Sequence, residues 1–151
     1  MTYDIILVAV CQNGMALEFA PDHLKDKNVY YEAISQNPMA MKFVNDSSED
    51  MNHYAVKKNG LSIKYISNPS EKTCNWAIKN NPRSLLFIRN PSEKAFKSTM
   101  KRDGLLLKYI HPCNQSYKLC LRAVNQNPDA LEYVNDHWMW LTLGKYLNNL
   151  K

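Results

Sequence analysis

The hydrophobic positions of this chain recur around a two-residue marker, Asn or Asp followed by Gly or Pro. Four residues before each marker stands a small residue, followed by an aliphatic residue or Met. Four residues after the Asn or Asp stands another such apolar residue, and an aromatic follows two places later. The markers, spaced by 22 or 24 residues with Gly and Pro alternating, are Asn13-Gly14, Asn37-Pro38, Asn59-Gly60, Asn81-Pro82, Asp103-Gly104 and Asn127-Pro128. Self-similarity at such a period indicates a repeat architecture.

Each copy of the repeat predicts two short helices separated by a sharp turn. In the fourth copy, small and apolar residues before the turn fall at positions i, i+1, i+4 and i+5, and those after it at i, i+1, i+3 and i+4. Both spacings place side chains on one face of a helix with about 3.6 residues per turn. The residues are Thr73, Cys74, Ala77 and Ile78 before the turn, and Ser84, Leu85, Phe87 and Ile88 after it.

The residues at the turn suit the start of a helix. Asn is a good N-cap because its side-chain oxygen accepts a hydrogen bond from a free backbone amide. Pro directly after it occupies the first helical position, where no N–H is needed, and Gly at that place permits a tight turn. Asp103 is expected to cap as well as the asparagines do. Ser48, Ser70 and Ser92 are predicted to be N-caps of three of the first helices.

These elements predict an all-α protein, a short α-solenoid of six helical hairpins of 22–24 residues. We expect the repeats over residues 1–136 and a C-terminal capping helix over residues 137–151, both in one domain. Helices this short are unstable alone, so each must be held by stacking on its neighbours. The recurrent aromatics are expected to form a ladder inside the stack. They are Phe19, Phe43, Tyr65, Phe87, Tyr109 and Tyr133.

The repeat resembles that of a known family. The stretches Ala9–Ala20 (AVCQNGMALEFA) and Ala123–Val134 (AVNQNPDALEYV) carry the pattern Ala-Val-x-x-Asn-Gly-x-Ala-Leu-x-Phe/Tyr most fully. This pattern is similar to the short repeat of the domain of unknown function 4116 type, and the similarity extends from Tyr3 to Asp136. That family occurs in giant viruses, other large viruses and bacteria. The resemblance therefore implies a repeat architecture and a viral or bacterial origin, and it implies no catalytic residues.

The chain has a net charge of +5, and in the middle repeats one or both of the two residues that end the first helix are basic. Stacking would align them in a column able to neutralise a phosphate backbone. This basic column consists of Lys57, Lys58, Lys79, Lys101 and Arg102. Lys42, Lys64 and Lys108 would form a second column on the second helices, interrupted at Leu86. The alternative interpretation is that cations here suit helix C-termini and keep the surface soluble.

The two ends of the array are candidate interaction surfaces. After Asp136 the repeat stops and large apolar residues follow, either as a capping helix over the last repeat or as a surface for a partner or for self-association. The first repeat has no evident cap, which favours end-to-end dimers or a partner there. The residues assigned to these surfaces are Trp138, Trp140 and Tyr146 at one end, and Ile5 and Ile6 at the other.

No pattern of catalytic or metal-binding residues is recognisable. The four cysteines lack the Cys-x-x-Cys spacing of zinc or redox sites, and the four histidines have no ligand spacing. No nucleophile elbow, phosphate-binding glycine loop or paired-carboxylate signature occurs. We therefore expect no enzyme activity, no cofactor and no metal. An acidic N-terminus and a short apolar run lead us to expect a soluble intracellular protein, in the host cytoplasm if it is viral, without membrane binding.

The sequence thus favours a non-catalytic scaffold or adaptor that recognises another protein, virus-encoded, as a structural component or a blocker of a host factor. Copies of the chain are further expected to associate through the ends of the solenoid. The alternative is an anion- or nucleic-acid-binding module that uses the basic column. The two functions differ in salt dependence, because counterion release makes nucleic-acid binding fall steeply as salt rises.

Overall fold

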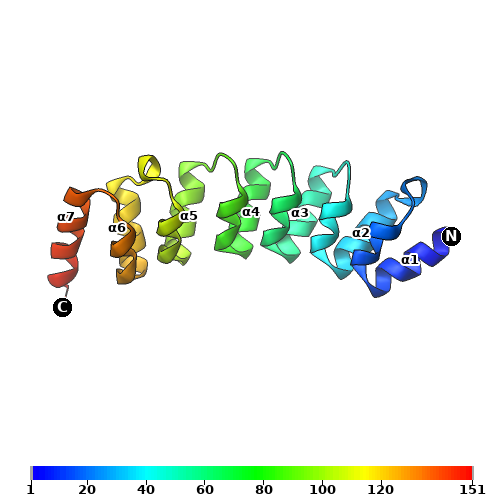
Figure 1. Ribbon diagram of the computed structural model, residues 1–151, viewed down its shortest axis with the longest axis horizontal. Coiled ribbons are helices and arrows are strands. Elements are labelled where there is room, and N and C mark those ends of the chain that lie inside the picture. Colours follow the sequence, from blue (N-terminus) through cyan, green and yellow to red (C-terminus); the bar gives the residue numbers. More distant parts are fainter. Residues whose placement is uncertain (1, 151) are drawn as a thin grey trace. The chain divides into compact units, whose positions relative to one another are not determined.

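The computed structural model describes residues 2–150, and within them it contains α-helices and 3₁₀-helices but no strand. Each repeat is a ten-residue α-helix followed by a six-residue 3₁₀-helix (Figure 1). The prediction of an all-α array of helical repeats is confirmed. The α-helices are α1 (Tyr3–Gln12), α2 (Lys27–Gln36), α3 (Glu49–Lys58), α4 (Glu71–Asn80), α5 (Glu93–Arg102), α6 (Tyr117–Gln126) and α7 (His137–Asn148).

The 3₁₀-helices of the repeats are η1 (Gly14–Phe19), η3 (Pro38–Phe43), η4 (Gly60–Tyr65), η5 (Pro82–Phe87), η6 (Gly104–Tyr109) and η8 (Pro128–Tyr133). Two extra 3₁₀ turns, η2 (Asp22–Leu24) and η7 (Pro112–Asn114), lie in the connections after the first and fifth repeats. These are the two connections where the interval between markers is 24 residues instead of 22. The longer intervals are therefore absorbed outside the repeating helices.

A single asparagine joins the two helices of a repeat. The backbone N–H of Asn59 ends α3 by donating to Ala55 O at 2.9 Å, and its side-chain oxygen accepts from the backbone N–H of Leu61 at 3.0 Å. Extended backbone at Asn59, with φ −146° and ψ 110°, turns the chain between the two helices. The same pair of bonds occurs at Asn13, Asn37, Asn81 and Asn127.

Asp103 differs from these asparagines. Its backbone N–H donates to Thr99 O at 2.9 Å, but its carboxylate caps no amide of η6. Its backbone angles, φ −152° and ψ 95°, are close to those of Asn13, at φ −146° and ψ 105°. The expectation that Asp103 would cap as well as the asparagines is therefore wrong. The serine N-caps are confirmed, since Ser48, Ser70 and Ser92 accept from the backbone N–H three residues later.

The second helix of each repeat is a 3₁₀-helix and not the α-helix that the spacing predicted. With about three residues per turn, Gly60, Ile63 and Ile66 lie above one another and are all buried. Tyr65 is rotated by about 120° from this ridge and is only partly buried. The predicted ladder of aromatics inside the stack is therefore wrong. Three of the six rings are exposed and three are only partly buried; the exposed ones are Phe19, Phe87 and Tyr109.

Glycine and proline alternate because consecutive repeats pack as pairs. In the second pair, a Cβ added to Gly60 would collide with the backbone oxygen of Ala77 in the next repeat. The Gly60 N–H donates to Asn80 Oδ1 at 2.8 Å, and Asn80 Nδ2 donates back to Lys57 O at 2.8 Å. This place requires a residue with an N–H and no side chain, which glycine satisfies and proline does not.

The same amide clamp joins the other two pairs. Gly14 N donates to Gln36 Oε1 and Gly104 N donates to Gln126 Oε1, each at 2.6 Å. The α-helices of a pair pack together extensively, whereas α2 and α3, which belong to different pairs, meet over fewer residues. The structural unit of the array is therefore two repeats.

The chain falls into two compact units, Met1–Ile88 with the first four repeats and Arg89–Lys151 with the last two and α7. The core of the first unit consists of the buried ridges of its α- and 3₁₀-helices, including Val10, Leu17, Ile34 and Met41. In the second unit the buried side chain of Gln115 ties the connection after η6 to η8. Its Nε2 donates to Ile110 O and Tyr133 O, each at 3.1 Å. Leu143 is the residue of α7 that is fully buried.

Replacing Gly104 with Ala is expected to lower the free energy of unfolding by about 1–3 kcal/mol, because the colliding oxygen belongs to the backbone of Ala123. Gly144→Ala is the matched control in the same unit. Its added Cβ meets only Leu131 Cδ2 at 3.7 Å, and Ala stabilises a helix by about 0.5–1 kcal/mol over Gly. Urea unfolding followed by circular dichroism measures both variants. Similar effects of the two substitutions would contradict the role of Gly104 in pairing repeats.

Candidate functional site

Two lysines of the predicted basic column share one aromatic ring. Lys57, near the end of α3, holds its Nζ 4.6 Å from the centroid of the Trp76 ring. Lys79, in α4, holds its Nζ 4.7 Å from the same centroid. Attraction between each ammonium and the negative face of the indole stabilises this arrangement. The structure thus brings these two predicted residues together from neighbouring repeats.

The other residues of the basic column lie elsewhere. Lys58 Nζ donates to Ser35 O at 3.2 Å and lies 5.2 Å from the centroid of Tyr54, so it joins the second and third repeats. Lys101 and Arg102 end α5 and are exposed. The five residues therefore divide between the two compact units, three in the first and two in the second.

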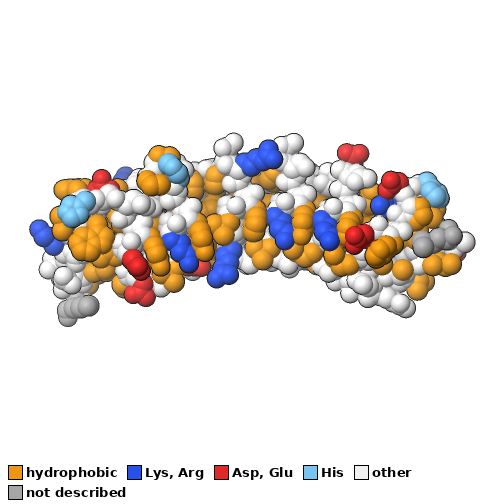
Figure 2. All heavy atoms as spheres, in the orientation of Figure 1, with side chains coloured by type: hydrophobic (Ala, Val, Ile, Leu, Met, Phe, Trp, Pro, Cys, Tyr) orange, Lys and Arg blue, Asp and Glu red, His pale blue; other side chains and the backbone are white. Residues whose placement is uncertain are grey.

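A second set of lysines lies on the 3₁₀-helices, each over the ring of the next residue. Lys42 Nζ is 4.3 Å from the centroid of Phe43, and Lys64 Nζ is 4.6 Å from the centroid of Tyr65. Figure 2 shows Lys and hydrophobic side chains alternating over the part of the first unit that holds η3 and η4. We refer to Lys42, Phe43, Lys64 and Tyr65 as the lysine–aromatic strip.

The second unit repeats this arrangement once, with Lys108 Nζ 4.9 Å from the centroid of Tyr109. Sequence analysis detected these lysines as a column but placed the rings inside the stack. The feature of the sequence that could have indicated this arrangement is a lysine followed directly by an aromatic residue at the same position of several repeats.

The outer face of α7 carries large apolar side chains. Helix α7 packs on η8 and α6, yet Trp138, Trp140 and Leu141 are exposed. The Trp138 ring lies 6.0 Å from that of Tyr117, and the Trp140 ring stacks on His137 at 6.4 Å between centroids. Tyr146 is partly buried. The predicted tryptophans thus lie at the surface, beside other rings.

The two N-terminal residues assigned to a partner surface differ in burial. Ile6 is only 3% exposed and belongs to the core with Val10 and Leu17, so its placement on a partner surface is wrong. Ile5, one residue earlier on the helix, is 57% exposed. The residues that match Ile5 in the later repeats are all buried; they are Val29, Met51, Thr73, Ala95 and Leu119. Ile5 therefore lies on the face that other repeats pack against a neighbour.

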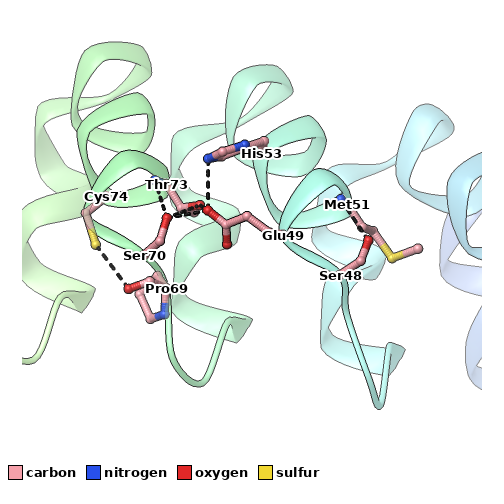
Figure 3. A network of polar contacts seen from close by, with 8 residues as sticks. All are labelled: Ser48, Glu49, Met51, His53, Pro69, Ser70, Thr73 and Cys74. Carbon is pink, nitrogen blue, oxygen red and sulfur yellow. Dashed lines mark hydrogen bonds and ion pairs between the residues drawn. The ribbon is translucent and has the colours of Figure 1, made fainter.

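One cluster of polar side chains joins the third and fourth repeats (Figure 3). Glu49 Oε1 accepts hydrogen bonds from Ser70 Oγ and, at 2.9 Å, from Thr73 Oγ1. The same oxygen lies 3.1 Å from His53 Nε2. Ser70 Oγ also accepts from the backbone N–H of Thr73 at 3.1 Å, as the N-cap of α4. The cluster connects the starts of α3 and α4.

Serine, histidine and glutamate in one cluster invite comparison with a catalytic triad, in which the imidazole takes the proton of the hydroxyl. Here the Ser70 hydroxyl donates to the carboxylate, and its oxygen caps a helix. His53 Nε2 lies close to Glu49 but is not aligned for a hydrogen bond. The cluster is therefore a contact between repeats, and no catalytic site is evident in residues 2–150.

The hydrogen bond from Ser70 lowers the pKa of Glu49, and Thr73, His53 and Lys72 lower it further, whereas partial burial opposes them. A carboxyl whose pKa is lower in the folded than in the unfolded state stabilises the fold above its unfolded pKa. That stabilisation is lost as the pH falls through the lowered, folded pKa. The contact between the third and fourth repeats is thus strongest at neutral pH.

The cysteines are free thiols, with Cys11 and Cys113 exposed and Cys74 and Cys120 buried. Burial raises the pKa of Cys120 to about 11, and the nearby charge of Asp136 adds to this. Burial also raises the pKa of Cys74. In the part of the chain that the structure describes, no group of three or more His, Cys, Asp or Glu residues is placed to hold a metal ion.

Residues 2–47 match the family model of a domain of unknown function, DUF4116. This range contains α1, η1, α2 and η3, the first pair of repeats held by the Gly14–Gln36 clamp. The family resemblance inferred from the sequence is confirmed for these residues. No curated protein and no solved structure matches the chain. Among the helices of residues 2–150, none has the length and apolar character needed to cross a bilayer.

Replacing Glu49 with Gln is expected to lower stability by about 0.5–1.5 kcal/mol at neutral pH, because hydrogen bonds to a charged acceptor are lost. The difference from wild type should shrink toward zero at pH values below the lowered pKa of Glu49. Urea unfolding at a series of pH values in the acid range measures this difference in the free energy of unfolding. Glu18→Gln, on an exposed side chain of the same unit, is the control. Parallel stability curves for wild type and Glu49→Gln would contradict this linkage.

Thiol labelling of the folded protein is expected to modify Cys113 first, because it is exposed and its Sγ lies 3.0 Å from His111 Nδ1. Cys11 should follow more slowly, since desolvation and Glu32 raise its pKa. Cys74 and Cys120 should react only in denaturant. Mass spectrometry of digests taken over time gives the order. Labelling of Cys120 at the rate of Cys113 would disagree with the packing of α6.

Proposed function

We propose that this chain, whose first two repeats form a DUF4116 domain, is a non-catalytic scaffold that binds another protein through apolar faces at the ends of its repeats. The observation that carries the proposal is the outer face of α7, where Trp138 is 66% exposed beside Trp140 and Leu141. A terminal helix that only capped a solenoid would present a polar outer face. Exposed tryptophan is instead the residue type that dominates binding hot spots.

A second copy of the chain supplies a surface that fits this face. Helix α1 exposes Ile5 and Val8, whereas the residues that match Ile5 in the later repeats are all buried. The α7 face of one copy against the α1 face of another would extend the packing that already joins consecutive repeats. Burial of both apolar faces favours association. A chain that assembles in this way could serve as a structural component of a virus. The same apolar faces could bind and block a host factor.

The alternative function, nucleic-acid binding by the basic column, is supported by the cluster of Lys57, Lys79 and Trp76. Two features of that cluster favour the scaffold instead. Both ammonium groups lie within 4.7 Å of the centroid of the ring on which a base would have to stack. Lys58, the third cation of the same unit, is engaged by Ser35 in joining two repeats.

Light scattering is expected to give the wild-type chain a mass above that of a monomer, at moderate and at high salt, because apolar contacts are not screened. The double variant Trp138→Glu, Trp140→Glu should be monomeric under both conditions. Tyr109→Glu, which alters an exposed ring on another element of the same unit, should assemble like wild type.

A wild-type chain that stays monomeric at every concentration would contradict end-to-end assembly. If the chain instead gains mass with a generic oligonucleotide, and only at low salt, the nucleic-acid alternative replaces the scaffold.

A further inference from the structure

The cations of the lysine–aromatic strip have no acidic partner. Ion pairs among residues 2–150 include Lys25 with Asp22, Glu49 with His53, and Lys97 with Glu93. Lys42 and Lys64 take part in none of them and are exposed. Each ammonium contacts only the ring that follows it. The strip is therefore a positively charged surface on which neither lysine is paired with a carboxylate of residues 2–150.

Charge along this row of the first unit changes from repeat to repeat. The residue that precedes the aromatic is Glu18 on η1, Lys42 on η3, Lys64 on η4 and Leu86 on η5. The row thus reads acidic, basic, basic and apolar, and consecutive 3₁₀-helices pack side by side. At its apolar end Leu86 and Phe87 are both exposed. A ligand that matches this row has two negative charges in the middle and an apolar group at one end.

We propose that the lysine–aromatic strip binds an extended acidic segment of a partner protein, with carboxylates three residues apart on Lys42 and Lys64 and an apolar side chain on Phe87. This rests on the proposed function, because it specifies the kind of protein segment that the scaffold takes. The surface lies on the 3₁₀-helices of the second to fourth repeats and is separate from α1 and α7.

The spacing of the repeats suits such a segment. Neighbouring helices pack about 8–10 Å apart, so equivalent lysines on η3 and η4 are separated by about that distance. An extended chain of the polyproline II type rises about 3.1 Å per residue with three residues per turn. Side chains at i, i+3 and i+6 therefore face the same side at intervals of about 9 Å. Each would meet one repeat of the strip.

Two observations favour a peptide over single-stranded nucleic acid. Bases bind such surfaces by stacking on aromatic faces, but the rings of Phe43 and Tyr65 already have an ammonium over them, at 4.3 and 4.6 Å. A carboxylate can pair with the ammonium from outside and leave this contact intact. A polyanion of uniform charge would also meet Glu18 at one end of the row and the uncharged Leu86 at the other.

The test is a titration of the full-length, ¹⁵N-labelled chain with two peptides of equal composition, followed by NMR. In Glu-Pro-Pro-Glu-Pro-Pro-Leu the carboxylates have the proposed spacing, and in Glu-Glu-Pro-Pro-Pro-Pro-Leu they do not. The first peptide is expected to shift the amide signals of residues 42–43, 64–65 and 86–87 and to bind at least about tenfold more tightly than the second. Oligothymidylate serves as the nucleic-acid probe.

Two matched double variants distinguish binding at the lysine–aromatic strip from a nonspecific effect of net charge. Lys42→Glu with Lys64→Glu should weaken binding of the first peptide at least about tenfold. Lys57→Glu with Lys79→Glu makes the same change in net charge on α3 and α4 of the same unit, and should weaken it less than about twofold. Circular dichroism confirms that both variants remain folded.

The proposal is overturned if the chain binds the two peptides with equal affinity. It is also overturned if the two double variants lose equal affinity for the first peptide. Tighter binding of oligothymidylate with shifts at the same residues overturns it as well and would make nucleic acid the ligand. If the peptide experiments fail but the double variant Trp138→Glu, Trp140→Glu still abolishes assembly, the lysine–aromatic strip is rejected as a binding site. The proposed scaffold function then stands. Failure of both experiments rejects the scaffold as well.

Discussion

In every second repeat the first residue of the 3₁₀-helix lies against the alanine carbonyl of the next repeat, and the rest of the array depends on this close approach. Only glycine leaves room for that oxygen, and only a residue with an N–H can donate to the Gln or Asn that reaches back from the neighbour. Proline can stand in the alternate repeats because no such donor is required there. The pair of repeats is therefore the unit of packing, and the family match over residues 2–47 has the extent of one pair.

The short 3₁₀-helices determine which side chains are exposed on the surface. The third and fourth residues of each later 3₁₀-helix are mostly buried, whereas the fifth and sixth lie closer to solvent, so the aromatic lies within reach of the preceding lysine in η3 and η4. A cation over the ring stabilises both side chains at the surface. The 3₁₀-helices that bury apolar side chains in the core thus also present a row of charged and apolar groups across successive repeats. An extended ligand can bind along such a surface.

Polar side chains inside the array serve mainly to join repeats. Gln36, Asn80 and Gln126 clamp the pairs, Lys58 bridges two pairs, and Glu49 ties Ser70 and Thr73 to the start of α3. Glu49 and Ser70, the polar residues that invite comparison with a catalytic triad, are engaged in this way. Among residues 2–150, exposed groups that do not join repeats in this way include tryptophan rings on α7, apolar side chains on α1 and cations on η3 and η4, and these suit binding better than chemistry.

The sequence by itself determined the all-α class, the six repeats, the turn at each asparagine and the serine caps, because these follow from local hydrogen bonding and a short period. It also singled out Trp138, Trp140 and Ile5, which are exposed. Tertiary packing decided the rest. Whether six residues form a 3₁₀- or an α-helix, and so which way Phe19 or Tyr109 points, depends on how closely the next repeat approaches. The burial of Ile6 beside an exposed Ile5 and the engagement of Lys58 by Ser35 likewise depend on neighbours more than twenty residues away in the sequence. Periodicity describes one helix at a time, and these contacts exist only between helices.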